Sequence, residues 1–284
     1  MPNPAIFLVD NGSLRSAATF ALRRLAETLS WKTGERIEAV SLLHSHKIPD
    51  EQLHGQPATI VKRRMRELIR EGRREFVILP LFLGPSLAIT EYLPSIVGEL
   101  RQDSADLVVK IADPVAGGNV EQPDTRLSQM LADHMRPYID DGRGRTLALV
   151  DHGTPIKPVN VLRDAVARQL AVQCGQSVQP CSMERRAGPE YAFNDPLLEN
   201  LAGVEGYRDS HLVLAMFFLL PGRHAGEGGD VADIADGMVR QGDFRSIQIC
   251  PLLGEHPALL EVLSDRLVAA LAAVNRRPGG RDPC

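Results

Sequence analysis

Residues 149–154 read LVDHGT, and they repeat residues 8–13, which read LVDNGS, 141 positions earlier in the chain. Each copy ends a short apolar run and precedes an apolar pattern of helical period. A glycine turn between an apolar strand and an amphipathic helix is typical of a parallel α/β sheet. The repeat therefore predicts a tandem duplication of one α/β domain.

The same order of strands and helices follows each copy. In the first half we expect strands at residues 5–9, 36–43, 75–83 and 107–112, and helices at 14–30, 57–72, 89–101 and 124–135. In the second half we expect strands at 147–150, 177–183, 211–220 and 246–251, and helices at 158–172, 196–202, 231–240 and 257–274. Each half is thus predicted to be a flavodoxin-like domain, a four-stranded parallel sheet flanked by helices, with its first three strands as neighbours.

A polar, glycine-rich stretch, DDGRGR at residues 140–145, has the composition of a domain linker. We therefore predict an N-terminal domain at residues 1–141, a C-terminal domain at 142–276, and a flexible tail at 277–284.

The composition restricts the class of protein. The chain has 284 residues, of which 44% are apolar and 24% charged, as in a soluble globular protein. It has no apolar run of about 20 residues and its first residues lack a signal-peptide pattern, so we expect a cytoplasmic protein without a membrane partner. The net charge of −4 gives no basic field, so we expect no nucleic-acid partner. The four cysteines lack CxxC spacing and are interpreted as buried or terminal thiols.

Two histidines and a glutamate follow strands of the second half. His152 follows the first strand, Glu184 the second, and His224 the third, within LLPGRHAGEGGD at residues 219–230. The carboxyl ends of parallel strands share one edge of the sheet, where ligands bind in open α/β folds. We therefore expect the three side chains to converge.

The first half lacks both histidines. Asn11 stands where the second half has His152, and residues 84–88 (GPSLA) replace the loop that carries His224. The first half is therefore interpreted as scaffold with a degenerate site. His44 and His46, after its second strand, are interpreted as solvated side chains.

These motifs resemble a known family. The HGT turn at His152, the strand end Ser182-Met183-Glu184, and the LPGRH loop that leads to Asp230 resemble the CbiX/SirB sirohydrochlorin chelatases, which are class II tetrapyrrole chelatases. They resemble more distantly the anaerobic cobaltochelatase and ferrochelatase. The segment between His224 and Asp230 is longer here than the family's short spacing.

The resemblance implies an enzyme of the lyase class that inserts Co²⁺ or Fe²⁺ into sirohydrochlorin in cobalamin or sirohaem biosynthesis. It implies that His152, Glu184 and His224 bind the metal and accept the pyrrole protons. A neutral-pH base and a mixed N/O ligand set suit this chemistry, and the set accommodates Co²⁺, Fe²⁺ and Ni²⁺ alike.

The substrate would be a polycarboxylate, which guanidinium groups bind well. We therefore expect Arg185, Arg186 and Arg223, with Gly153 and Thr154 of the HGT turn, to contact it. No permanently bound cofactor is expected. Because the fused repeat supplies its own pseudo-twofold partner, we expect a monomer or a weak dimer.

Two alternatives stay open at this point. One is a non-catalytic carrier that binds a metal or a tetrapyrrole. The other is a metal-dependent hydrolase whose His-Glu-His cluster activates water.

Overall fold

The computed structural model describes residues 3–139 and 144–275. Its first sheet contains β1 (Ala5–Asp10), β2 (Ile37–Ser41), β3 (Glu75–Pro80) and β4 (Val108–Ile111), all parallel, in the order β2-β1-β3-β4. The helices α1 (Ser16–Thr33), α2 (Val61–Arg70) and α3 (Leu93–Asp103) follow the first three strands. In β1 and β3 every residue after the first is buried, as expected of parallel strands covered on both faces.

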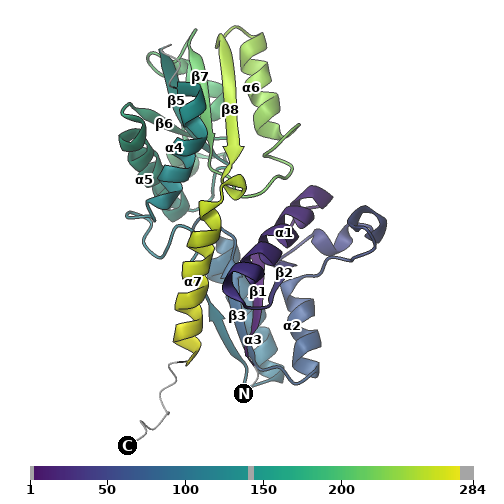
Figure 1. The fold of residues 1–284 in the computed structure, drawn as a ribbon. Coiled ribbons are helices and arrows are strands. Elements are labelled where there is room, and N and C mark those ends of the chain that lie inside the picture. The colour runs from purple at the N-terminus through teal and green to yellow at the C-terminus, as the bar shows by residue number, and fades with distance from the viewer. Residues whose placement is uncertain (1–2, 140–143, 276–284) are drawn as a thin grey trace, which may run out of the picture. The chain divides into compact units, whose positions relative to one another are not determined.

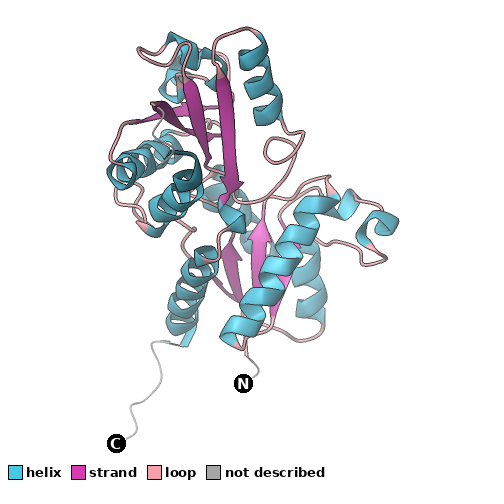
Figure 2. Cartoon of the chain, turned by 45° about the horizontal axis from the view of Figure 1, so that its top comes forward, coloured by secondary structure: helices cyan, strands magenta, loops and turns pink. Residues whose placement is uncertain are grey.

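The second sheet repeats this arrangement with β5 (Arg145–Asp151), β6 (Val178–Ser182), β7 (His211–Met216) and β8 (Ser246–Leu252), in the order β6-β5-β7-β8. The helices α5 (Lys157–Cys174) and α6 (Asp230–Arg240) belong to it. Figure 2 shows both sheets in magenta with cyan helices beside them. The predicted fold class and the flavodoxin-like order of neighbouring strands are confirmed.

The chain does not divide into compact units at residues 141 and 142, the predicted boundary. One unit comprises Met1–Phe82, Leu87–Val115 and Leu260–Cys284, and the other Leu83–Ser86 and Ala116–Leu259. Helix α4 (Arg126–Ile139), expected in the first half, packs on α5, β7 and β8, beside the second sheet in Figure 1. Helix α7 (Ala258–Asn275), expected in the second half, lies from Leu260 onward in the first unit, where Arg266 donates to the carbonyls of Pro114 and Val115. Each unit thus contains a helix from the other half of the sequence.

Some shorter elements differ from the expected helices. The helix expected at residues 196–202 is the 3₁₀ segment η5 (Leu198–Gly203), preceded by η4 (Pro189–Asn194). A π-helical turn, η3 (Ala88–Tyr92), opens α3. The expected linker residues 140–143 and the expected tail lie outside the described residues, and Arg145 already belongs to β5.

Two further observations concern the helices and the cysteines. Within the described ranges, no helix is both long and apolar enough to cross a membrane. Cys181 and Cys250 are buried thiols, and burial raises the pKa of both, that of Cys250 to about 12.

Candidate active site

His152 and Glu184 come from neighbouring strand ends that are joined by backbone hydrogen bonds. The Met183 N–H donates to Asp151 O at 2.8 Å, and the Glu184 N–H donates to His152 O at 3.2 Å. The turn comes so close to β6 that a Cβ on Gly153, at φ +93°, would lie 1.9 Å from the Glu184 carbonyl oxygen. Only glycine fits there, which explains its place in the HGT motif.

His224 is carried by the loop between β7 and α6. The Gly222 N–H donates to Ala225 O at 2.8 Å, and the Val231 N–H donates to His224 O at 3.1 Å. The glycine-rich segment after His224 folds back, so that His224 Nδ1 lies 2.6 Å from Asp230 Oδ2. The long His-to-Asp spacing in the sequence is therefore compatible with direct contact.

The structure brings the two histidines and Glu184 together, all within one unit. The rings of His152 and His224 have centroids 4.5 Å apart and meet edge to face at 69°. Glu184 Oε1 lies 3.4 Å from His152 Nε2. All three side chains remain accessible, with exposed fractions of 46% for His152, 32% for His224 and 61% for Glu184. Their catalytic and metal-binding roles stay predictions.

The partners of the two rings determine which nitrogens are available. His152 Nδ1 lies 3.1 Å from Gly153 O, and His224 Nδ1 faces the Asp230 carboxylate. Both oxygens can only accept, so each Nδ1 carries the hydrogen. In the neutral imidazole the Nε2 of His224 then offers a lone pair, the arrangement by which proteins orient metal-binding and proton-accepting histidines. The Nε2 of His152 faces Glu184 Oε1 at 3.4 Å, so it is open to a ligand once that carboxylate turns away.

The predicted three-ligand metal site is not preformed. Within residues 3–139 and 144–275, no group of three or more His, Cys, Asp or Glu side chains is arranged to hold a metal ion. The two oriented imidazoles and the nearby Glu184 carboxylate can hold a divalent ion together only after the side chains move. Such a site suits an ion that is bound and then released.

The three predicted substrate arginines differ in their surroundings. Arg185 donates to Asp195 Oδ1 and to Gly188 O, both at 2.9 Å. The Arg186 guanidinium lies 6.0 Å from the centre of the Tyr191 ring. Arg223 is largely exposed, with Nε 3.7 Å from Asp230. Arg223 is thus more exposed than Arg185, and its contact with a carboxylate is longer.

Gly153 and Thr154 use their polar groups within the protein. The Gly153 N–H donates to Asp151 Oδ1 at 3.1 Å. Both backbone groups of Thr154 pair with the Asn194 side chain at 3.0 Å, and its hydroxyl accepts from the Ile156 N–H. Their contact with substrate stays a prediction, and the bonds give them a structural role in the turn.

Sequence reasoning missed the residues beneath this turn. Asp151 is buried, its pKa is raised by burial, and it lies near the buried guanidinium of Arg163. A signal was present, because Arg163 stands in a helix among Leu162, Val166 and Leu170, while the matching position of the first half holds Leu22. The orienting contact of Asp230 was also missed.

The corresponding place in the first half is an apolar cavity. Asn11, Leu43 and Leu87, with Tyr92, line a space of about 450 Å³ there, and no histidine lines it. His44 and His46 are exposed, as predicted. The absence of a histidine from this lining agrees with the interpretation that the first half lacks the imidazole pair.

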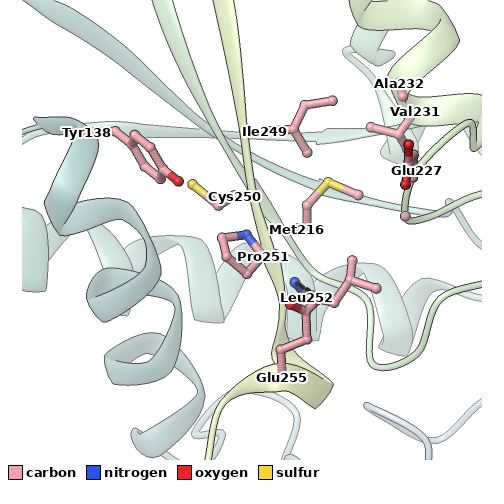
Figure 3. A pocket seen from close by; sticks show the side chains of 11 residues that line it. Tyr138, Met216, Glu227, Val231, Ala232, Ile249, Cys250, Pro251, Leu252 and Glu255 are labelled. Atoms are coloured by element: carbon pink, nitrogen blue, oxygen red, sulfur yellow. Dashed lines mark hydrogen bonds between the residues drawn. The ribbon is translucent and has the colours of Figure 1, made fainter. Parts of the chain in front are cut away.

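A second cavity, of about 340 Å³, is lined in part by Gly226 and Glu227, which follow His224 in the same loop (Figure 3). Met216, Ile249 and Leu252 give it an apolar wall, and among the described residues that line it the charged ones are Glu227 and Glu255. A polycarboxylate is repelled by two carboxylates, so this cavity does not fit the expected substrate.

Comparisons with known proteins bear on the fold. No family model matches the chain, and no curated protein matches its sequence. Among solved structures, SirB from Bacillus subtilis with Fe³⁺ superposes with a TM-score of 0.70 and 14% identity over 96% of this chain and 98% of that chain. The sirohydrochlorin chelatase SirB from Bacillus subtilis subspecies spizizenii in complex with cobalt gives 0.70 and 12% identity over 96% and 97%. CbiX, the terminal enzyme for siroheme biosynthesis in denitrifying bacteria, gives 0.59 and 16% identity over 94% and 99%. Over nearly its whole length, the chain has the fold of the SirB and CbiX chelatases.

Proposed function

We propose that the protein is a metal chelatase that inserts a divalent ion, Co²⁺ or Fe²⁺, into a sirohydrochlorin-type tetrapyrrole. The observation that carries the proposal is the pair of imidazoles 4.5 Å apart, each held through Nδ1, at the carboxyl edge of the second sheet. The likeness of fold to SirB, solved with Fe³⁺ and with cobalt, supports it. The choice of metal, the pathway and a cytoplasmic location stay predictions.

The reaction replaces two pyrrole N–H protons by one divalent ion. His152 and His224 would hold the ion through their Nε2 atoms, with Glu184 turning toward it as the third ligand. As the ion passes to the macrocycle, the same nitrogens become available to accept the two protons, and imidazole is an effective base at neutral pH. The contact of His224 Nδ1 with Asp230 fixes the orientation of the ring during this exchange.

The tetrapyrrole carries many carboxylates around an apolar ring. Arg223, whose side chain is 78% exposed, would bind one of them from the same loop as His224. Arg185 and Arg186 would bind others beside Glu184.

The visible spectrum of the macrocycle tests the proposal against both alternatives. Sirohydrochlorin in large excess over the protein is mixed with Co²⁺, and its band shift is followed in time against a protein-free control. A chelatase converts many equivalents per protein molecule. Conversion or binding that stops at one equivalent would favour a carrier, and an unchanged spectrum together with Co²⁺-dependent ester or phosphoester cleavage would favour a hydrolase.

A further inference from the structure

Arg163 is a charged residue at a position where packing requires none. Its side chain is 2% exposed, on α5. Leu22, which occupies the matching place on α1, is equally buried. Charged side chains are almost never fully buried unless they are paired, so a specific set of partners must retain this guanidinium.

The guanidinium donates hydrogen bonds to four residues, among them Phe193 through its carbonyl at 3.5 Å, and lies near Asp151. Nη1 donates to Ser182 Oγ at 2.6 Å and to Asn194 O at 3.2 Å, while Nε and Nη2 donate to Asp164 Oδ1 at 2.9 and 2.8 Å. Nη1 lies 3.8 Å from Asp151 Oδ1. A planar fork of donors can serve these directions at once, whereas an ammonium group cannot.

Ser182 and Asn194 transmit these contacts to the turn that carries His152. The Ser182 hydroxyl donates to Asp151 Oδ1 at 2.6 Å, and that oxygen also accepts the Gly153 N–H. The Asn194 side chain, fully buried, pairs with both backbone groups of Thr154. The residues on either side of His152 are therefore held by the same network.

The first half gives an internal comparison. Asp10 and Ser41 correspond to Asp151 and Ser182 and are paired in the same register. Asp10 keeps hydrogen bonds from the Ser41 side chain and the Gly12 backbone, but Leu22 replaces the arginine, and the Oδ1 atom of Asp10 has no hydrogen-bond partner among the described residues. The network is complete in the half whose turn carries a histidine and incomplete in the half whose turn carries Asn11.

We propose that Arg163 is a positioning residue: through Ser182 and Asn194, its guanidinium fixes the turn at residues 151–154 and so directs the His152 imidazole toward His224 and Glu184. This inference rests on the proposed chelatase function for its effect on rate. The competing explanation is that Arg163 only balances the buried charge of Asp151.

Arg163→Lys separates the two explanations, because lysine keeps the positive charge and loses the fork. We expect the amides of Gly153 and Thr154 to exchange with solvent at least about tenfold faster. We expect kcat for Co²⁺ insertion, per folded molecule, to fall by about 10²-fold, the loss that follows a 1 Å misplacement of a reacting group, while KM for the tetrapyrrole stays within about twofold. Arg168→Lys, on the exposed face of α5, is the matched control and should change neither the amide exchange nor kcat.

Ser182→Ala is the second variant, since it breaks the chain of hydrogen bonds without changing a charge. Like Arg163→Lys, it should speed the exchange of the two amides and lower kcat. The proposal is wrong if Arg163→Lys keeps kcat within twofold, or if kcat falls only in proportion to folded protein while the two amides stay protected. If the wild-type protein inserts no metal, the proposed function fails, and amide exchange together with the Kd for Co²⁺ decides the positioning role. Unchanged exchange and Kd in both variants would then overturn it.

Discussion

The same buried carboxylate position has different neighbours in the two halves. Arg163 Nη1 lies 3.8 Å from Asp151 Oδ1, whereas Leu22 stands at the position of the first half that matches Arg163. Burial raises the pKa of both carboxyl groups, that of Asp10 to about 6. The change from Leu22 to Arg163 coincides with the change from Asn11 to His152 in the adjoining turn. Burying a charge is costly unless partners compensate it, and partners of Arg163 are the residues that hold the His152 turn.

Asp10 gives the stability of the protein a pH dependence. Its pKa is raised from 3.8 to about 6 on folding, so the folded state binds its proton more tightly, and stability contributed below pH 4 is lost as the pH rises toward 6. The shift corresponds to about 3 kcal/mol. Asp10→Asn should remove this slope between pH 4 and 6, measured by urea unfolding at several pH values.

Asp113→Asn, at an exposed carboxylate of the same unit, is the control and should keep the wild-type slope. An Asp10→Asn protein whose stability changes with pH as the wild type does would contradict the assignment.

At the scale of elements, the order of strands could be predicted because it follows from the repeated sequence and from chain-crossover rules that hold locally. The exchange of α4 and α7 could not, because the alternation of strands and helices reads the same whichever sheet a helix covers. For a similar reason the histidines were found from their places after strands, while the contact between His224 and Asp230 depends on how the intervening loop folds. Asn194 was missed because it lies in a 3₁₀ segment without sequence periodicity.

The junction of the His224 loop with α6 yields a second prediction. Asp230→Asn keeps the size of the side chain but loses the charge that orients the His224 ring. Loss of an orienting partner of this kind costs about 10–100-fold in metal affinity or activity. The Kd for Co²⁺ should therefore rise, and kcat should fall, by about that factor.

Asp233→Asn, one turn further along α6, is the matched control. If the two variants prove equally active, Asp230 does no more than begin the helix.

At the scale of the whole molecule, duplication has produced two sheets with the same strand order and unlike ligand edges. One edge has an imidazole pair with a carboxylate, and the other has an apolar cavity lined by Asn11 and Leu43. The central claim is therefore that metal insertion depends on the second half's histidines and not on histidines of the first half.

Multiple-turnover insertion of Co²⁺ into sirohydrochlorin by His152→Ala, His224→Ala and His44→Ala proteins tests this claim most directly, with folding checked by circular dichroism. We predict that His152→Ala and His224→Ala each lower kcat by about 10²–10⁴-fold, the range for loss of a positioned acid–base group, with the fold intact because both side chains lie in exposed turns. His44→Ala, which removes a histidine that follows β2, the first-half strand that matches the one before Glu184, should stay within a few-fold of wild type. A loss in His44→Ala as large as that in His152→Ala, or full activity in the His152→Ala protein, would contradict the account.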